Sequence, residues 1–264
     1  MLKTLDSCAL AMAAGMFLAG CYTVPETGRR SLNFISPSQE LQMGASAFTQ
    51  IKQSEKISDD PDKNSTVKRV GQRIAKVVGD DLPTAEWEFV VFEDDAANAF
   101  ALPGGKVGVY SGLFKLARSD DELAVVMGHE IAHVTARHGA ERMSQGVLLA
   151  AGGVALDVAL SDKDSETRNL ALAAYGVGST VGVMLPYSRL NESEADEIGL
   201  IYAARAGYDP RAAVQFWKAM KENSEGKSKP PEFLSTHPSD DTRIKKLEEM
   251  MPRMVEIYEK SDKQ

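Results

Sequence analysis

The most restrictive feature of this sequence is a segment that reads as a buried helix and yet carries two histidines and a glutamate. It runs from Ser119 to Met143, and its first residues, Ser119-Asp120-Asp121-Glu122, form a capping box that predicts a helix start. The segment is made apolar by Val125, Val126, Met127, Ile131 and Val134. Because burying unpartnered polar side chains costs free energy, its histidines and glutamate need a shared partner.

These polar residues form the pattern His129-Glu130-Ile131-Ala132-His133. Residues four apart on a helix lie one turn apart on the same face, so both imidazoles can bind one metal ion. Glu130 lies beside them without having to be a ligand. This HExxH spacing is typical of sites where two imidazoles hold Zn²⁺ and the glutamate accepts a proton from water. The alternative, an amphipathic helix with exposed His and Glu, fits the apolar surroundings less well.

A catalytic zinc ion usually has three protein ligands, so two histidines leave this site one ligand short. The metzincin pattern is excluded, because Ala136 and Gly139 stand where it requires glycine and histidine. We interpret His138, which points to another face of the helix, as a surface residue or an indirect contributor.

The best source of a third ligand is the acidic run from Ser188 to Asp196. Glu192 and Asp196 are four residues apart and share a helix face, whereas Glu194 lies on another face. One carboxylate of the pair can bind the metal while the other accepts the free N–H of a ligating histidine. Acidic helices are usually solvated, so this pair indicates a metal site only because the chain also contains the HExxH pattern.

Composition narrows the class of protein further. The chain has 264 residues and a formal net charge of -8, which suits a globular domain and disfavours a nucleic-acid binder. Its only cysteines, Cys8 and Cys21, rule out a disulfide scaffold.

The first 20 residues are predicted to be a lipoprotein signal peptide. Ala9 to Ala19 is an apolar run too short to span a bilayer, and Leu18-Ala19-Gly20-Cys21 resembles the bacterial lipoprotein box. The resemblance implies cleavage before Cys21 and lipid on that residue, with residues 21–35 as a tether and the outer membrane as the location. The alternative is a buried N-terminal helix that happens to end in cysteine.

The remaining residues, 36–264, are predicted to form one mostly helical α+β domain with a small sheet beside the HExxH helix. Capping and periodicity predict helices over 36–56, 65–78, 119–143, 188–206, 210–221 and 238–258, and strands over 87–92, 98–102 and 106–110. Two Gly- and Ala-rich stretches, Gly146–Leu160 and Leu170–Leu185, are unconvincing as membrane spans, since Asp157 interrupts the first and glycines the second. A hairpin packed on the core, a lid over a cleft and a membrane contact all remain open.

HExxH followed some sixty residues later by ExxxD resembles the zinc endopeptidases of the CaaX prenyl protease and HtpX type, peptidase family M48. The likeness includes Asn98–Leu113 and the element Ser235-Thr236-His237-Pro238-Ser239 with Arg243, and it covers Ser36 to Met250. It implies a single gluzincin-like domain that binds one Zn²⁺ through His129, His133 and Glu192. It also implies Glu130 as general base and Asp196 as a partner of a ligand or a proton donor. The chain looks closer to the soluble, periplasmic lipoprotein branch, similar to the β-barrel-assembly-enhancing protease, and to the mitochondrial inner-membrane relatives than to the members with several membrane spans.

Two further groups of residues are candidates for the reaction. His237 and Arg243 could stabilise an oxyanion; His237 could instead occupy the open metal position, or simply cap a helix. The strand with Asn98, Ala99, Phe100 and Ala101 could bind an extended peptide by backbone pairing, or be an edge strand without a ligand.

The function predicted from the sequence is a zinc metalloendopeptidase that acts on unfolded or misassembled envelope proteins. Its expected partners are polypeptide substrates, a membrane reached through lipid on Cys21, and an envelope assembly partner of unknown identity. The alternatives are a binding or chaperone-like lipoprotein with an occluded zinc site, and a zinc hydrolase acting on non-peptide or terminal peptide bonds.

Overall fold

The computed structural model describes residues 20–224, 233–234, 237 and 241–261. The expected signal peptide therefore lies, apart from Gly20, outside the described residues. The chain divides into two compact units. The larger unit consists of residues 38–136 and 191–264, and the smaller one of residues 1–37 and 137–190.

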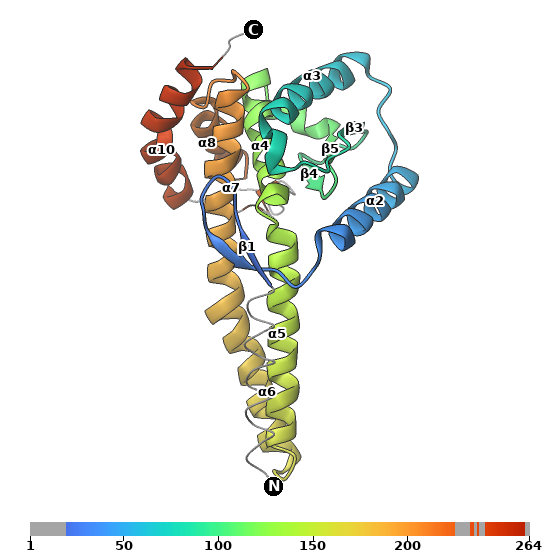
Figure 1. The fold of residues 1–264 in the computed structure, drawn as a ribbon, viewed down its shortest axis with the longest axis vertical. Coiled ribbons are helices and arrows are strands. Elements are labelled where there is room, and N and C mark those ends of the chain that lie inside the picture. Colours follow the sequence, from blue (N-terminus) through green and yellow to red (C-terminus); the bar gives the residue numbers. More distant parts are fainter. Residues whose placement is uncertain (1–19, 225–232, 235–236, 238–240, 262–264) are drawn as a thin grey trace. The chain divides into compact units, whose positions relative to one another are not determined.

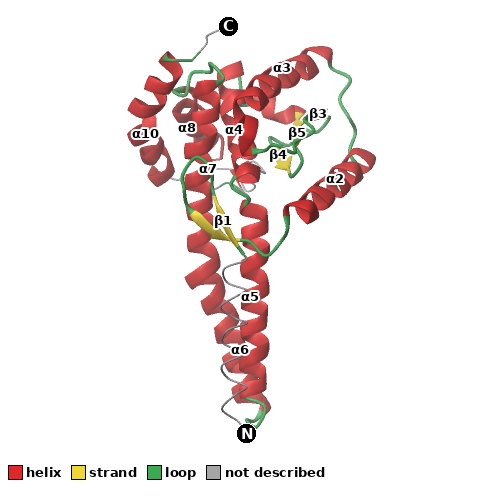
Figure 2. Ribbon diagram, viewed as in Figure 1, coloured by secondary structure: helices red, strands yellow, loops and turns green. Residues whose placement is uncertain are grey.

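The larger unit combines helices with one small sheet (Figures 1 and 2). Its helices are α2 (Pro37–Ser54), α3 (Pro61–Val78), α4 (Asp120–Thr135), α8 (Ala212–Ser224) and α10 (Asp241–Glu259), together with the part of α7 (Leu185–Arg205) from Asn191 on. Its strands are β3 (Glu88–Phe92), β4 (Ala99–Leu102) and β5 (Lys106–Tyr110). The short 3-10 turns η1 (Gly79–Asp81) and η2 (Ser111–Lys115) follow α3 and β5. The expected class, α+β and predominantly helical, is confirmed.

The sheet has the order β3-β5-β4, so β4 lies at its edge. Strand β5 pairs in parallel with β3 and antiparallel with β4, and Pro103-Gly104-Gly105 makes the turn between β4 and β5. Gly104 and Gly105 have φ values of 90° and 78°, a region that side chains disfavour, which explains two successive glycines at this turn. Helix α4 packs beside β4. The predicted edge strand therefore lies next to the HExxH helix.

Helix α4 begins as predicted but ends earlier. The Ser119 hydroxyl accepts a hydrogen bond from the Glu122 backbone N–H at 3.2 Å, as expected of an N-cap. The single helix predicted from Ser119 to Met143 is wrong, because α4 ends at Thr135 and a new helix, α5 (His138–Ala159), follows. Arg137 between them adopts a left-handed conformation with φ 56°, which no α-helix can contain.

Helices α4 and α7 touch through their backbones at two glycines. A Cβ atom on Gly199 would lie 2.6 Å from the His129 backbone nitrogen, and one on Gly128 would lie 2.7 Å from the Gly199 carbonyl oxygen. Both distances are too short for any larger residue. These glycines therefore set how closely the helix with His129 and the helix with Asp196 can approach.

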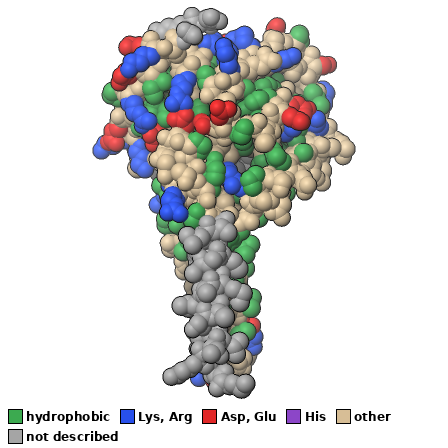
Figure 3. Space-filling model, in the orientation of Figure 1, with side chains coloured by type: hydrophobic (Ala, Val, Ile, Leu, Met, Phe, Trp, Pro, Cys, Tyr) green, Lys and Arg blue, Asp and Glu red, His purple; other side chains and the backbone are tan. Residues whose placement is uncertain are grey.

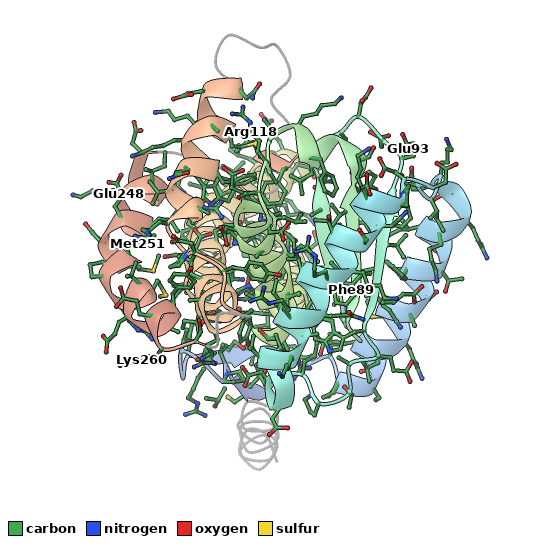
Figure 4. All side chains as sticks on the ribbon, turned by 90° about the horizontal axis from the view of Figure 1, so that it is seen from above. Phe89, Glu93, Arg118, Glu248, Met251 and Lys260 are labelled. Carbon is green, nitrogen blue, oxygen red and sulfur yellow. The ribbon has the colours of Figure 1, made fainter. Side chains whose placement is uncertain are left out.

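Helices α8 and α10 of the same unit pack against each other. Glu248 of α10, labelled in Figure 4, accepts a hydrogen bond from Lys218 of α8 at 2.7 Å. Beneath this exposed pair the buried residues Phe216, Trp217, Leu247 and Met254 contribute to the core. Helix α10 is thereby held against α8 mainly by apolar contact.

The smaller unit begins with a hairpin of strands β1 (Cys21–Thr23) and β2 (Arg30–Leu32). Arg29 makes two hydrogen bonds of 2.8 Å to the Glu141 carboxylate, and the Phe34 backbone N–H donates to the Ser144 hydroxyl at 2.8 Å. Part of the segment expected to be a tether is thus folded against the start of α5. Cys21 itself is exposed.

Helix α5 and helix α6 (Ser165–Ser179) form an antiparallel pair, and the π-helical turn η3 (Thr180–Met184) joins α6 to α7. None of the residues from Gln145 to Leu190 is buried. Within the described residues, one continuous helix, Ser165–Arg205, is long and apolar enough to cross a membrane by length and composition.

We predict that Gly199→Ala destabilises the chain, although alanine normally stabilises a helix. The added methyl group would meet the backbone of α4, and such overpacking costs about 1–3 kcal/mol in unfolding free energy. Gly139→Ala is the matched control, because a Cβ there meets nothing within 4 Å and should stabilise α5 by about 0.5–1 kcal/mol. Urea denaturation of both variants in chelator provides the comparison, and equal midpoints would contradict the assigned role of Gly199.

Candidate metal centre

Four side chains from three places in the sequence converge at one point of the larger unit. His129 and His133 come from α4, Glu192 from α7, and His237 from the segment before α10. One ligand atom from each of the four lies within 4.8 Å of all the others. His129 is 2 % exposed and His237 9 % exposed, so the cluster lies below the surface.

The spacing of these atoms fits a tetrahedral metal ion. His129 Nε2 lies 3.1 Å from His133 Nε2 and 3.1 Å from His237 Nδ1. The Glu192 oxygens lie 3.4 Å from His129 Nε2, 3.3 Å from His133 Nε2 and 3.0 Å from His237 Nδ1. Ligands about 2.0–2.1 Å from a tetrahedral ion stand about 3.3 Å apart. The imidazoles of His129 and His133, with or without that of His237, and the Glu192 carboxylate are therefore spaced as the ligands of one metal ion would be.

His129 is oriented by Asp196 and Arg243. Asp196 Oδ1 lies 3.0 Å from His129 Nδ1, the ring nitrogen opposite the cluster. Arg243 binds the two oxygens of Asp196 through Nε and an η nitrogen at 2.8 and 2.7 Å, and its other η nitrogen lies 3.2 Å from Glu192. The carboxylate of Asp196 thus orients the ring of His129, while Arg243 neutralises the acidic residues of α7.

Sequence reasoning missed two aromatic residues that support this arrangement. The Arg243 guanidinium lies 3.5 Å above the ring of Trp217, which is also 6.3 Å from the His129 ring. Phe233 stacks on Trp217 at 5.6 Å and contacts the His237 ring at 4.6 Å. The sequence predicted only a helix over 210–221, and no local signal marked Trp217 or Phe233 as part of the site.

Glu130 lies beside the cluster with an oxygen that lacks a partner. The residue is 5 % exposed, and its Oε1 accepts no hydrogen bond from any described residue. This oxygen lies 3.3 Å from His237 Nε2. An orphaned buried carboxylate oxygen is costly unless a water molecule or a substrate group meets it. This position suits an acceptor of a proton from water.

The charges of the centre shift its pKa values in opposite directions. Burial by itself would lower the pKa of His129, but hydrogen bonds to Asp196 and Glu192 outweigh it and raise the pKa to about 9. Burial raises the pKa of Glu130, against the opposing charge of His237. Burial would also raise the pKa of Glu192, but the three histidines hold it below its usual range. Without a metal, His129 thus carries a proton near neutral pH.

The residues of the predicted peptide-binding strand lie on β4 and just before it. The Asn98 carbonyl accepts a hydrogen bond from the Tyr110 N–H at 3.0 Å, and Ala99 and Ala101 pair with β5. The ring of Phe100 packs against Phe92 at 6.0 Å. The Phe100 side chain thus takes part in the packing of the sheet.

His138 belongs to the smaller unit and is 1 % exposed. The interpretation of His138 as a surface residue is therefore wrong, because its side chain is buried at the start of α5. It is not one of the residues of the metal cluster.

The fold and the site together define a metallopeptidase of the HExxH class. The family model for peptidase family M48 matches residues 61–251. The chain belongs to peptidase family M48, and the predicted enzyme class, a metalloendopeptidase, is confirmed.

Individual relatives show the same similarity. The chain is 36% identical over 242 residues to the mitochondrial metalloendopeptidase OMA1 of Schizosaccharomyces pombe, covering 90% of this chain and 69% of that protein. It is 30% identical over 257 residues to the beta-barrel assembly-enhancing protease of Escherichia coli, covering 95% of this chain and 52% of that protein. A putative protease of the same name from Vibrio cholerae is 34% identical, over 84% of this chain and 46% of that protein. The chain thus spans about half the length of these bacterial relatives.

We predict that metal binding releases protons and strengthens with pH. Because the metal must displace the proton of His129, whose pKa lies at about 9, the apparent affinity should rise about tenfold per pH unit between pH 6.5 and 8.5. Calorimetric titration of the metal-free chain with Zn²⁺ in buffers of different ionisation enthalpy measures both effects. Asp196→Asn removes the charge that raises this pKa and should flatten the dependence. A pH-independent affinity in the original chain would contradict the prediction.

Proposed function

We propose that this chain is a zinc-dependent endopeptidase that cleaves unfolded or misassembled proteins of the bacterial envelope. The observation that carries the proposal is the cluster of the buried His129 with the partly buried His133 and Glu192. Beside it lies Glu130 Oε1, which accepts no hydrogen bond from the described residues. Two imidazoles and a carboxylate are typical zinc ligands, and they leave a position for water or substrate.

In the proposed reaction the residues of the chain have separate tasks. His129, His133 and Glu192 would hold a zinc ion, which would supply Lewis acidity toward the scissile carbonyl and toward water. Glu130 accepts the proton of the attacking water and delivers it to the leaving amine, a task helped by burial, which raises its pKa toward neutrality. Asp196 accepts a hydrogen bond from the Nδ1–H of His129, and this bond orients the ring so that Nε2 faces the other ligands. Arg243 is a positioning residue, because it donates to Asp196 and approaches Glu192.

His237 gives the site a resting state in this proposal. Its Nδ1 lies 3.1 Å from His129 Nε2 and 3.0 Å from Glu192, so His237 could be a further ligand of a metal held there. Its Nε2 lies 3.3 Å from Glu130, so the ring also covers the proposed base. His237 must move before water or a peptide can reach the centre.

The segment with His237 also approaches the proposed peptide-binding strand. The Phe233 backbone N–H donates to the Ala97 carbonyl, just before β4, at 3.2 Å. A substrate that pairs with the edge of β4 would compete for this region. Pairing through the backbone imposes little side-chain specificity and therefore suits unfolded substrates.

The envelope location rests on Cys21 and on the names of the bacterial relatives. We propose that the exposed Cys21 carries lipid after removal of residues 1–20, which would hold the chain on the periplasmic side of the outer membrane. The relatives from E. coli and V. cholerae are named for enhancing β-barrel assembly. Proteins of the same membrane are accordingly the proposed substrates here.

We predict that Glu130→Gln abolishes proteolysis but not metal binding. The amide keeps the shape of the side chain and cannot accept the proton, so cleavage of an unfolded casein should fall at least about a hundredfold. Glu248→Gln, on the exposed side of α10, is the matched control and should leave the rate unchanged. Mass spectrometry should find internal fragments. Equal rates for the Glu130→Gln variant and the original chain would refute the proposed base.

We predict that His237→Ala increases proteolysis. The variant loses the side chain that covers the centre but keeps His129, His133 and Glu192, so kcat/KM for casein should rise about tenfold as the accessible state gains population. Zinc content per chain, measured by atomic absorption, should stay at one. Loss of activity with zinc retained would instead assign His237 a role in the reaction. Inactivity of both the variant and the original chain would favour a binding protein with an occluded site.

A further inference from the structure

The antiparallel helices of the smaller unit carry most of the exposed apolar side chains of the described residues. Of the large hydrophobic residues that are exposed, all but Phe34, Met43 and Ile57 lie between Met143 and Leu190. Val154, Val158, Leu170 and Val177 are 64–72% exposed. Green, hydrophobic side chains line the visible edge of these helices in Figure 3. Solvent-exposed apolar surface of this extent marks an interaction site.

Most of these residues form one stripe on each helix, and Leu148, Tyr187 and Leu190 lie outside the stripes. Along α5 the residues of the stripe stand at spacings of four, eleven and fifteen, and along α6 and its continuation at seven, eleven and fifteen, which is one helix face in each case. The residues are Met143, Val147, Val154 and Val158 on α5, and Leu170, Val177, Val181 and Leu185 on α6 and its continuation. Each stripe is about 22 Å long at 1.5 Å per residue.

Polar groups within the same helices are satisfied internally. The Ser179 and Thr180 hydroxyls both donate to the Gly176 carbonyl, at 3.0 and 2.9 Å, and the Tyr175 hydroxyl donates to the Leu149 carbonyl at 2.9 Å. Asp157 and Arg168 join the two helices through two hydrogen bonds of 2.5 Å. Water would satisfy such groups without these bonds, whereas hydrocarbon cannot.

Charged residues mark the limits of the apolar part. Between Leu170 and Ser188 there is no Asp, Glu, Lys or Arg, a length of about 28 Å, close to the thickness of the hydrocarbon layer of a bilayer. Charges gather at the connection between the helices, from Asp162 to Arg168, and return at Arg189. Tyr187 beside Arg189 is 41% exposed, the residue type that lies at membrane interfaces.

We propose that residues 143–190, the apolar hairpin, insert into a lipid bilayer. Lipid is the occupant that fits these observations. Hydroxyl groups inside a bilayer must form hydrogen bonds within the protein, and charged residues must lie near the ends of the helices, as they do here. The hairpin then holds the chain to a membrane independently of any lipid on Cys21. A second copy of the chain covering the stripes is the competing occupant, and the experiment below separates the two.

The test places an environment-sensitive fluorophore on one residue of a full chain without other cysteines. Cys8→Ser and Cys21→Ser remove the natural thiols and lipidation, and Val177→Cys carries the label. Vesicles of phosphatidylethanolamine and phosphatidylglycerol should shift the emission to the blue, and nitroxides on the acyl chains should quench it. The same label at Lys68→Cys, exposed on α3, should not respond. No response at Val177 would overturn the proposal, as would a blue shift that needs protein concentration and no lipid.

A charge in the stripe tests the same proposal by affinity. In the Val177→Cys background, Val181→Asp should weaken vesicle partition about a hundredfold, the effect of a carboxylate at the centre of a membrane helix. Met43→Asp makes the same kind of change at an exposed apolar residue of α2 and should leave partition unaltered. Equal losses in both variants would refute insertion of the hairpin. Neither readout involves proteolysis, so failure of the proposed peptidase function would not affect them.

Discussion

The backbone contact between α4 and α7 is the constraint on which the rest of the centre depends. Gly128 immediately precedes His129, and Gly199 lies one turn after Asp196, so the two helices meet where both carry their polar side chains. Any Cβ at this contact would push the helices apart. The short distance between His129 and Asp196, and that between His133 and Glu192, follow from this approach.

Because the two helices lie this close, their buried carboxylates need positive charge nearby. Glu130, Glu192 and Asp196 are three carboxylates with little access to solvent. Arg243 offsets part of this charge through Asp196 and is itself held over the ring of Trp217. The remaining charge and the 3.0–3.4 Å spacing of the ligand atoms favour a divalent cation. Through Arg243, helix α10 therefore belongs to the site.

The secondary structure was largely predictable because it depends on local signals. Ser119 caps α4 as its sequence indicates, Gly79 ends α3, and the two glycines after Pro103 make the turn of the β4–β5 hairpin. The break at Arg137 was not predictable, since an arginine in the left-handed conformation has no distinctive sequence pattern. The folded segment at Cys21 was missed because its strands are only three residues long.

By itself the sequence determined the HExxH pattern of His129, Glu130 and His133, the pairing of Glu192 with Asp196 on one helix face, and the α+β class. These depend on spacings of a few residues, which helix geometry converts directly into neighbours. Only the tertiary structure decided that His237 completes the cluster, that Trp217 supports Arg243, and that residues 145–190 are left unburied. Such contacts join segments dozens of residues apart, and they depend on how closely whole helices pack, which no local spacing encodes.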